Sequence, residues 1–483
     1  MYNKTINKQR SSMSGLEFLR STKIVSTVGT ATDGTSKLKS LIKAGVNVFR
    51  LNFSHGNHGD HLKRITNIRS VANEVGCNIA ILADLQGPKF RIGEVKSDIK
   101  VIKGNNYIFD KNIEIGDFSR VNLSHDEIYE SLSIGSNILM DDGKLQFVVK
   151  KISKDKINTE VVVGGYIKSN KGINLPDVVI NTNPLTPKDI EDLKFILNQD
   201  VDWIALSFVQ KLSDVEEVKK YIGDKAGVIA KIEKPSALKE LTSIIGACEG
   251  IMVARGDLGV ELPPEKVPGI QKEIILECRQ AGKPVIVATQ MLESMIDSPS
   301  PTRAEASDVA TAVFDGADAV MLSAETAVGL FPTEAVTIMD RIICSAEKHI
   351  KSHRGDGPQN LKVENFVYNA VSHSAVSLAE SVKAKAVVAF TASGKTAYRM
   401  ARERPDLLLV VMTPDEKVQR RLSLLWGAYS FLSKVQGYEA AIEEAKQIIR
   451  KQKFANIGDA IVVVAGMPFG ISGSTNSIRV VDI

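Results

Sequence analysis

The sequence of 483 residues is poor in cysteine and has no long apolar segment, and both absences narrow the class of protein. No apolar run approaches the roughly 18 residues needed to cross a bilayer. The polar leader, residues 1–18, lacks the apolar block of a signal peptide. The four cysteines are scattered without metal-site spacing, so we expect reduced core residues. They are Cys77, Cys248, Cys278 and Cys344. We therefore expect a cytoplasmic protein with no membrane partner.

An excess of charge of one sign is also missing. The chain has 61 basic and 57 acidic residues, which leaves a formal net charge of only +4. This balance, with no stripe of aromatic and basic residues, argues against nucleic acid as the main partner, although basic clusters could bind anionic metabolites. The composition is 43% hydrophobic and 24% charged, as in globular proteins with an ample core. The length predicts about three domains.

Eight short apolar runs alternate with amphipathic stretches of helical periodicity. The runs are rich in Val, Ile and Ala and are apolar on both faces, as are parallel strands covered by helices. They begin at Lys23, Gly45, Asn78, Val201, Gly227, Gly250, Pro284 and Ala317. Eight strand–helix units in series favour an α/β fold of the (β/α)8 TIM-barrel type, over residues 19–86 and 184–350. A doubly wound open sheet is the structural alternative.

Two further regions accompany the predicted barrel. Residues 87–183 interrupt it between the third and fourth strands, and a structureless loop of that length would be unusual. Because this segment is β-rich and punctuated by Gly, Asn and Asp, we expect an inserted β-barrel lid domain over one end of the barrel. Residues 355–483 alternate helices with strands, which predicts a separate C-terminal α/β domain.

Polar residues recur where the predicted barrel strands end. One such residue could be a satisfied buried polar group or a helix cap, but seven strands that converge on one face favour an active site. These residues are Arg50, Asn52, Asp84, Ser207, Lys231, Glu233, Arg255, Asp257, Thr289, Gln290, Ser323 and Glu325.

The residue types indicate an anionic substrate and a divalent metal. Glu233 and Asp257 can supply carboxylate oxygens to Mg²⁺ while open positions remain for substrate. Lys231 shares a strand face with Glu233 and can stabilise a developing enolate or a transferring phosphoryl group. Arg50 and Arg91 offer positive charge to phosphate oxygens. These patterns alone leave both phosphoryl transfer and aldol chemistry open.

Longer motifs resemble one family, the pyruvate kinases, and they follow the family's order over nearly the whole chain. The pair KIEKPSAL and MVARGDLG is the most specific part of the resemblance. The motifs are RLNFSHG from Arg50, GPKFRIG from Gly87, KGINLP from Lys171, KIEKPSAL from Lys231, GIMVARGDLGVELP from Gly250, GKPVIVATQMLESMI from Gly282, PTRAEASDVATAVFDGADAVMLSAETAVG from Pro301 and GSTNSIRV from Gly473.

The resemblance implies a phosphoryl transfer from phosphoenolpyruvate to ADP, giving pyruvate and ATP as the last step of glycolysis. Glu233 and Asp257 match the family's ligands for Mg²⁺ (or Mn²⁺), and Lys231 matches the lysine that stabilises the enolate and the phosphoryl group. Gly256, Asp257 and Thr289 match the contacts to the substrate carboxylate.

Further residues are carried over from the family in the same way. Arg50 and three nucleotide-binding candidates match residues that meet the transferred phosphate and the nucleotide; the three are His55, Arg91 and Lys171. Thr289 and Ser323 could lie on the path of proton delivery. His55 could also be only a solvated loop histidine.

One departure from the family pattern bears on monovalent cations. Many members hold K⁺ with residues that match Asn52, Ser54 and Asp84 and with the backbone carbonyl of the residue at Leu85. Those members carry Thr-Lys where this chain has Leu85 and Gln86, and Glu where it has Lys89. Because the ammonium of Lys89 can supply the charge that K⁺ would bring, we expect a K⁺-independent enzyme. The alternative is that Lys89 points to solvent.

The C-terminal region resembles the family's regulatory domain. Its loop joins a strand to a helix, so that amides, hydroxyls and an ammonium could bind the phosphate of an allosteric effector. The candidate residues are Thr391, Ser393, Lys395 and Thr396. The stretch GMPFGISGSTN lacks the Trp and Arg with which some members bind fructose 1,6-bisphosphate, so this particular effector is disfavoured. The loop could instead only cap the helix.

Two rival functions remain open on the sequence. A Mg²⁺-dependent barrel lyase or aldolase could use the same core residues for pyruvate-like enolates, but it would not need Arg91 and Lys171. A non-catalytic homologue is disfavoured by the joint presence of four residues, Lys231, Glu233, Asp257 and Thr289. The resemblance also implies a homotetramer.

Overall fold

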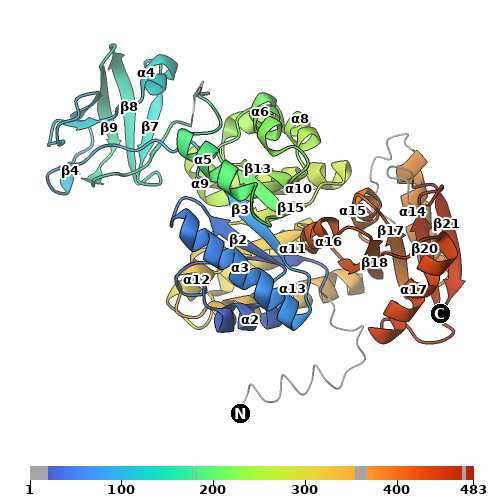
Figure 1. Ribbon diagram of the computed structural model, residues 1–483. Coiled ribbons are helices and arrows are strands. Elements are labelled where there is room, and N and C mark those ends of the chain that lie inside the picture. Colours follow the sequence, from blue (N-terminus) through green and yellow to red (C-terminus); the bar gives the residue numbers. More distant parts are fainter. Residues whose placement is uncertain (1–19, 177, 181, 354–366, 470–474) are drawn as a thin grey trace.

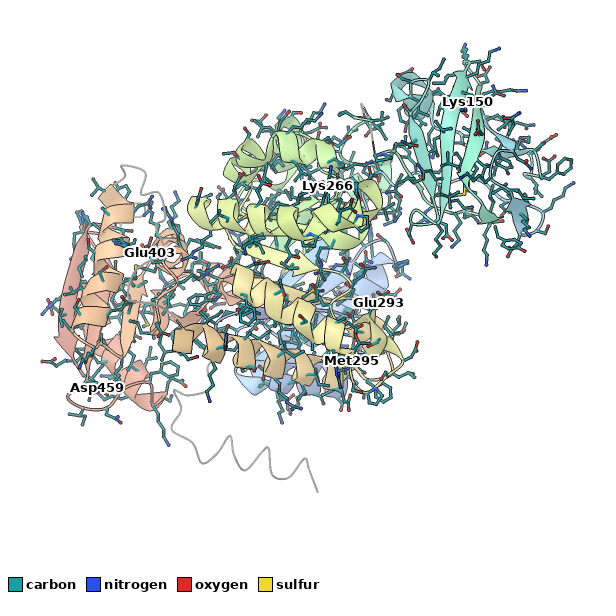
Figure 2. The ribbon with its side chains drawn as sticks, turned by 180° about the vertical axis from the view of Figure 1, so that it is seen from behind. Lys150, Lys266, Glu293, Met295, Glu403 and Asp459 are labelled. Carbon is teal, nitrogen blue, oxygen red and sulfur yellow. The ribbon has the colours of Figure 1, made fainter. Side chains whose placement is uncertain are left out.

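The computed structural model describes residues 20–353 apart from 177 and 181, then residues 367–469 and 475–483. Three folded parts follow one another across the molecule, with the barrel in the middle (Figure 1). The inserted part lies at one end of the barrel and the C-terminal part at the other. Figure 2 shows the same order from behind, with Lys150 and Asp459 at opposite ends. The expected polar leader, residues 1–18, lies outside the described residues.

A closed barrel of eight parallel strands forms the centre, and this finding excludes the open sheet. Around the ring the order is β1-β16-β15-β14-β13-β12-β3-β2, so every strand pairs with its neighbours in the chain once the insertion is set aside. The strands are β1 Lys23–Thr27, β2 Val48–Asn52, β3 Ala80–Asp84, β12 Trp203–Leu206, β13 Gly227–Ile232, β14 Gly250–Ala254, β15 Val285–Ala288 and β16 Ala319–Leu322.

Helices surround the barrel because each apolar stripe of a helix is buried against the outer face of the strands. Side chains such as Leu41, Ile68 and Ile274 are fully buried in this layer. Capping boxes at Asn57 and Thr186 start two of the helices. The helices are α2 Thr35–Ala44, α3 His58–Val75, α5 Pro187–Ile196, α6 Leu212–Ile222, α7 Pro235–Lys239, α8 Leu241–Ala247, α9 Arg255–Glu261, α10 Val267–Ala281, α11 Arg303–Asp315, α12 Ala324–Ala327 and α13 Pro332–His353, with short 3₁₀ turns η1 Pro264–Lys266 and η2 Glu293–Ile296.

The segment between β3 and β12 folds as a β-rich lid with its own core. Tyr107, Phe109 and Phe147 pack edge-on or tilted at its centre. Its strands form two separate sheets. One has six strands in the order β11-β7-β8-β9-β5-β6, and the other is the pair β10-β4. The elements are β4 Ile99–Val101, β5 Asn106–Asp110, β6 Arg120–Asn122, α4 Asp126–Ser131, β7 Asn137–Met140, β8 Leu145–Ile152, β9 Lys156–Val163, β10 Gly165–Ile167 and β11 Ile173–Asn174.

The C-terminal part is the expected α/β layer structure. Its five-stranded sheet runs β19-β18-β17-β20-β21, parallel except for the last pair, and apolar clusters lie against both of its faces. The elements are α14 Val367–Ser381, β17 Ala386–Phe390, α15 Lys395–Arg402, β18 Leu408–Thr413, α16 Glu416–Arg421, η3 Leu422–Leu424, β19 Ala428–Leu432, α17 Tyr438–Lys451, β20 Ala460–Ala465 and β21 Ser477–Asp482.

This C-terminal part packs on the amino-terminal end of the barrel. Leu424 joins the cluster of side chains that fills the barrel interior. Arg404 donates hydrogen bonds to both carboxylate oxygens of Asp318, which directly precedes β16, each at 3.1 Å. The ammonium of Lys23 at the start of β1 donates to the carbonyl of Ala428 at 2.9 Å. The carboxyl ends of the barrel strands are therefore left to the lid side.

The expectation that all four cysteines are core residues is wrong for one of them. Cys248 and Cys278 are buried, Cys344 is partly buried, and Cys77 is exposed. Cys77 follows Gly76, the left-handed C-cap of α3, at the surface end of that helix. All four are free thiols. Within the described residues, no helix combines the length and the apolar character that crossing a membrane requires.

Candidate active site

A buried lysine lies at the centre of the polar residues on the carboxyl-end face of the barrel. The ammonium of Lys231, on β13, donates to the hydroxyl of Ser207 at 2.8 Å. It lies 3.0 Å from a carboxylate oxygen of Glu233 and 3.2 Å from one of Asp84. Only 11% of the Lys231 side chain is exposed, and both acidic side chains are 1% exposed. Three neighbouring strands thus bring one cation and two anions together away from water.

Arg50 extends this cluster to β2. Its Nε donates to the second carboxylate oxygen of Asp84 at 2.6 Å, and its Nη1 donates to the hydroxyl of Thr27 at 3.1 Å. Burial alone would raise the pKa of Asp84, but the charges of Lys231 and Arg50 lower it. Burial opposes the charge of Lys231, yet Asp84 and Glu233 raise the pKa of the amine. The lysine is therefore held as an ammonium.

Glu233 is also buried and paired with Lys231, but the balance between burial and neighbouring charges is reversed. Its carboxylate accepts the backbone N–H of Phe208 at 2.8 Å, where Phe208 has a φ of +56°. Burial raises the pKa of Glu233 to about 7, and the negative charge of Asp257 adds to the rise, whereas Lys231 lowers it. Two carboxylates that disfavour each other's charge are a suitable place for a cation.

A short helix begins at the end of β14 and carries the next group of candidates. In α9, the backbone N–H of Gly256 donates to the hydroxyl of Thr289 at 2.8 Å. Thr289 follows β15 with a φ of +67°, a left-handed conformation that turns its hydroxyl toward α9. Arg255 fixes the same turn, because its Nη2 donates to the Thr289 carbonyl at 2.7 Å. A Cβ at Gly256 would lie only 3.3 Å from the Thr289 hydroxyl.

Lys89 lies beside the site and does not point away to solvent. Its ammonium is 3.7 Å from a carboxylate oxygen of Asp257, and 30% of each side chain is exposed. The residues matching the family's K⁺ site are close to this cluster. Asn52 accepts the N–H of Ser54 at 3.1 Å, and the carbonyl of Leu85 accepts the hydroxyl of Ser207 at 2.8 Å.

The nucleotide candidates are less tightly held. Lys171 in the lid pairs with Asp141 at 2.6 Å, and the adjacent Arg91 donates to the carbonyl of Asn170 at 3.1 Å. His55 is exposed on the loop after β2, and its carbonyl lies 3.0 Å from Nε2 of the buried His61. Lys171 and Arg91 make these contacts within the lid, and His55 makes its contact within the barrel. None of the three contacts involves the Lys231 cluster.

Ser323 lies at the end of β16, where its backbone N–H donates to Glu325 at 2.7 Å. Sequence reasoning missed Thr27, which ends β1 and supports Arg50. Thr27 could have been found by the same signal that identified the residues on the other seven strands, a polar residue at the carboxyl end of a barrel strand. With Thr27, all eight strands contribute polar groups to this face.

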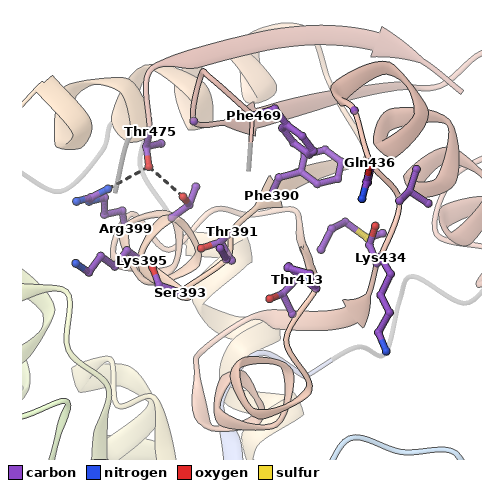
Figure 3. Close-up of a pocket in the computed structure, with 18 residues that line it drawn as sticks. Phe390, Thr391, Ser393, Lys395, Arg399, Thr413, Lys434, Gln436, Phe469 and Thr475 are labelled. Atoms are coloured by element: carbon purple, nitrogen blue, oxygen red, sulfur yellow. Dashed lines mark hydrogen bonds between the residues drawn. The ribbon is translucent and has the colours of Figure 1, made fainter. Parts of the chain in front are cut away.

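The effector candidates line a cavity of about 430 Å³ in the C-terminal part, beside β17 and α15. Figure 3 shows Lys395 and Arg399 on one side and Phe390 and Phe469 on another. Arg399 donates to the hydroxyl of Thr475 at 3.0 Å. Further lining residues include Thr391, Ser393, Thr396, Thr413, Lys434 and Gln436. Sequence reasoning missed the two cations Arg399 and Lys434.

The candidate loop has a local structural role as well. The hydroxyl of Thr391 accepts the N–H of Gly394 at 2.9 Å, and the hydroxyls of Thr396 and Thr475 are 3.0 Å apart. Of the C-terminal stretch considered for this site, residues 470–474 lie outside the described residues.

A closed (β/α)8 barrel with a cationic cluster and acidic partners at its carboxyl-end face defines a barrel enzyme that acts on an anionic substrate. The comparisons with known proteins narrow this class. The family model described as "Pyruvate kinase, barrel domain" matches residues 19–336, and the family model "Pyruvate kinase, alpha/beta domain" matches residues 369–481. The chain belongs to the pyruvate kinase family and is a phosphotransferase enzyme.

Individual relatives agree with this assignment. A pyruvate kinase of Agrobacterium vitis is 48% identical over 467 residues, covering 96% of this chain and 97% of the relative. One of Methylorubrum extorquens is 46% identical, covering 95% and 97%. The crystal structure of a pyruvate kinase from Cryptosporidium parvum superimposes with a TM-score of 0.89, at 34% identity and 96% coverage of both chains.

Proposed function

We propose that this protein transfers the phosphoryl group of phosphoenolpyruvate to ADP, giving pyruvate and ATP, with Mg²⁺ or Mn²⁺ and without a requirement for K⁺. The observation that carries the proposal is the ammonium of Lys231, held within 3.2 Å of Asp84, Glu233 and Ser207 at the carboxyl-end face of the barrel. Membership in the pyruvate kinase family supplies the reaction class.

The residues fit a divalent cation that is shared with the substrate. In the described part of the chain, no cluster of three His, Cys, Asp or Glu side chains could hold a metal alone. Mg²⁺ needs no such cage, because kinase sites bind it through one or two carboxylates together with substrate oxygens. Glu233 and Asp257 are that pair; burial raises the pKa of Glu233, and the negative charge of Asp257 adds to the rise. When bound, the ion would neutralise negative charge on the substrate and on the enolate.

The protein's own groups would act on the two charges that move during transfer. Phosphoenolpyruvate is bound with its carboxylate toward the Gly256–Thr289 turn, where the Thr289 hydroxyl is already fixed by an amide. Lys231 then faces the oxygen that becomes the enolate, and Arg50 faces the phosphoryl group. Both cations are buried and anchored on Asp84, so little reorganisation is needed as charge develops. Thr289 and Ser323 are the candidates for carrying the proton to the enolate.

The lid and the loop after β2 would hold the nucleotide. Lys171 and Arg91 are exposed enough to reach an anion, and His55 is exposed on the barrel side. Two partly exposed cations on the lid suit a substrate that enters and leaves at each turnover. A lyase or aldolase would have no use for them.

The test is a coupled assay for pyruvate formation from phosphoenolpyruvate with Mg²⁺, with and without ADP. Formation should depend strictly on ADP, and ADP-independent formation would favour a lyase instead. Lys231→Met should lower kcat by about 10²- to 10³-fold, the cost of removing one charge-stabilising donor. The matched control is Lys266→Met, an exposed lysine on the barrel, which should retain wild-type activity.

Independence from K⁺ is supported by the 3.7 Å contact between Lys89 and Asp257. The enzyme should be fully active in tetramethylammonium or sodium salts, and a severalfold increase on addition of K⁺ would contradict the proposal. Lys89→Gln should lose activity in tetramethylammonium and regain part of it with K⁺. Lys96→Gln, an exposed lid lysine, is the control and should behave as the wild type.

The cavity beside α15 supports a second, regulatory part of the proposal, the binding of a phosphorylated effector. Hydroxyls and the cations Lys395, Arg399 and Lys434 surround a space of about 430 Å³. Isothermal titration with a series of sugar phosphates and nucleotides should reveal binding that Lys395→Met weakens. The absence of binding by every compound would refute an effector role.

The family resemblance supports a proposal for the assembly, and the polar leader and scattered cysteines support one for the location in the cell. We propose a cytoplasmic homotetramer. Light scattering coupled to size exclusion would give four times the chain mass of 52.5 kDa, and a monomeric mass would overturn this part.

A further inference from the structure

One carboxylate connects three segments of the site. Glu261, the last residue of α9, accepts a hydrogen bond from the ammonium of Lys234 at 2.8 Å. The same oxygen, Oε1, accepts the side-chain N–H of Asn174 at 3.0 Å. Asn174 ends β11 in the lid, so this contact crosses from the lid to the barrel over a sequence separation of 87 residues.

The position of each partner in the sequence is informative. Lys234 directly follows Glu233, and Glu261 lies one helical turn after Asp257. The ion pair therefore joins the two segments that carry the proposed metal ligands. Asn174 lies three residues after Lys171, the lid lysine proposed to meet the nucleotide.

A gain in stability does not explain why this ion pair is buried. Only 9% of the Lys234 side chain and 1% of the Glu261 side chain are exposed. The second carboxylate oxygen of Glu261, Oε2, is buried without a hydrogen-bond partner. Replacing a buried ion pair by apolar residues of similar size is often neutral or stabilising. What such a pair offers instead is a fixed distance between the segments that it joins.

A second tether shows that the lid does not depend on Asn174 for attachment. The side chain of Gln210 accepts the N–H of Ile180 at 3.1 Å and donates to its carbonyl at 2.9 Å. This neutral pair attaches the returning lid segment to the barrel without a link to either proposed metal ligand. The contact of Asn174 is different, because its acceptor is charged and lies on α9.

We propose that Glu261 is a positioning residue that couples the metal site to the lid. Its ion pair with Lys234 fixes the spacing of Glu233 and Asp257, and its bond to Asn174 makes the placement of the lid depend on the same carboxylate. The inference rests on the proposed function, which assigns Glu233 and Asp257 to the metal.

Direct metal binding tests the first half without turnover. Isothermal titration of Mn²⁺ into the full-length protein should show about 10-fold weaker binding for Glu261→Gln, the size of effect that supporting groups have on metal sites. Asn174→Ala, which keeps the ion pair, should weaken Mn²⁺ binding by less than Glu261→Gln does, because the coupling of lid and metal acts in both directions. Lys234→Met/Glu261→Gln, which leaves no unpaired buried charge, should show the same weaker binding even if Glu261→Gln alone is poorly folded.

Hydrogen exchange tests the coupling. Mn²⁺ should slow exchange of lid amides in residues 89–95 and 167–174 of the wild type. Asn174→Ala should lose this protection and raise KM for ADP about 10-fold, as expected for a lost bond to a charged acceptor, with kcat changed far less. Asn122→Ala, whose side chain bonds only within the lid, should behave as the wild type.

The outcomes separate this inference from the function on which it rests. Wild-type Mn²⁺ affinity in both Glu261 variants, or retained protection in Asn174→Ala, would overturn the coupling. Glu233→Gln serves as the reference, because wild-type Mn²⁺ affinity in that variant would refute the metal assignment itself. Failure of both Glu261 variants to fold, with retained protection in Asn174→Ala, would leave the cluster a structural role only.

Discussion

Replacement of the buried Lys23 should change the pH dependence of stability in a predictable direction. The ammonium lies at the junction of the barrel and the C-terminal part, where it donates to the Ala428 carbonyl and lies 4.8 Å from the ring centre of Tyr429. Burial, with the charge of Arg20, lowers the pKa of Lys23 from 10.5 to about 7, although Glu347 partly opposes this. The unfolded chain keeps the ordinary value.

The sign follows from proton counting. Below pH 7 the lysine is charged in both states, so its contribution does not change with pH. Between pH 7 and 10.5 the unfolded chain binds more protons than the folded protein, so this group makes stability rise with pH. At about 1.36 kcal/mol per pH unit, the rise from pH 7 to pH 9 is about 2–3 kcal/mol. Lys23→Met lacks this rise.

The assay is urea unfolding of the wild type and Lys23→Met at several pH values. Tryptophan fluorescence reports the relevant region, because Trp203 lies in β12 and Trp426 packs beside Arg404. The stability of Lys23→Met relative to the wild type should be greatest at pH 6–7 and fall by about 2–3 kcal/mol by pH 9. Lys385→Met, an exposed lysine, should show no such trend. A difference that stays constant from pH 6 to 9 would refute the reasoning.

Three further substitutions give expected outcomes. Arg404→Met should destabilise the protein by about 3–5 kcal/mol because it leaves the buried Asp318 carboxylate uncompensated, whereas Arg404→Met/Asp318→Asn should recover most of the loss. Calorimetry distinguishes the two, and equal losses would contradict the explanation. His61→Phe keeps a ring in place but loses the N–H to the neighbouring loop carbonyl, so KM for ADP should rise about fivefold with kcat retained. His61→Gln should restore it, and unchanged KM in the phenylalanine variant would rule out this role. Gly87→Ala should lower kcat about 10- to 100-fold, since φ is +69° there and the new Cβ would meet Ser207 at 2.8 Å; wild-type kcat would show that the contact is irrelevant.

The barrel could be predicted because its signal is local. Each strand is a short run that is apolar on both faces, and each helix has apolar residues at helical spacing. The order of the elements can therefore be read along the sequence. Polar residues at strand ends were equally readable, since parallel strands bring their carboxyl ends to one face. The prediction for Cys77 was wrong because burial depends on which end of a helix meets the surface, and a residue's type does not give that.

The pairing of the charges could not be predicted from spacing. Lys231 lies on β13, far along the chain from Arg50 on β2 and Asp84 on β3, and the contacts of the three side chains depend on the register of the closed ring. The left-handed turn at Thr289 and the tether from Asn174 to Glu261 likewise have no local signature.

The sequence by itself determined the kinds of element, their order and the set of residues able to handle an anionic substrate. These depend on periodicity and side-chain chemistry, which are properties of short segments. The tertiary structure decided which acid stays ionised beside which cation. Coulomb interactions and desolvation depend on distance and burial. The charges of Lys231 and Arg50 lower the pKa of Asp84 against its burial, whereas burial, with the charge of Asp257, raises the pKa of Glu233, and this difference is set by the packing of the closed barrel.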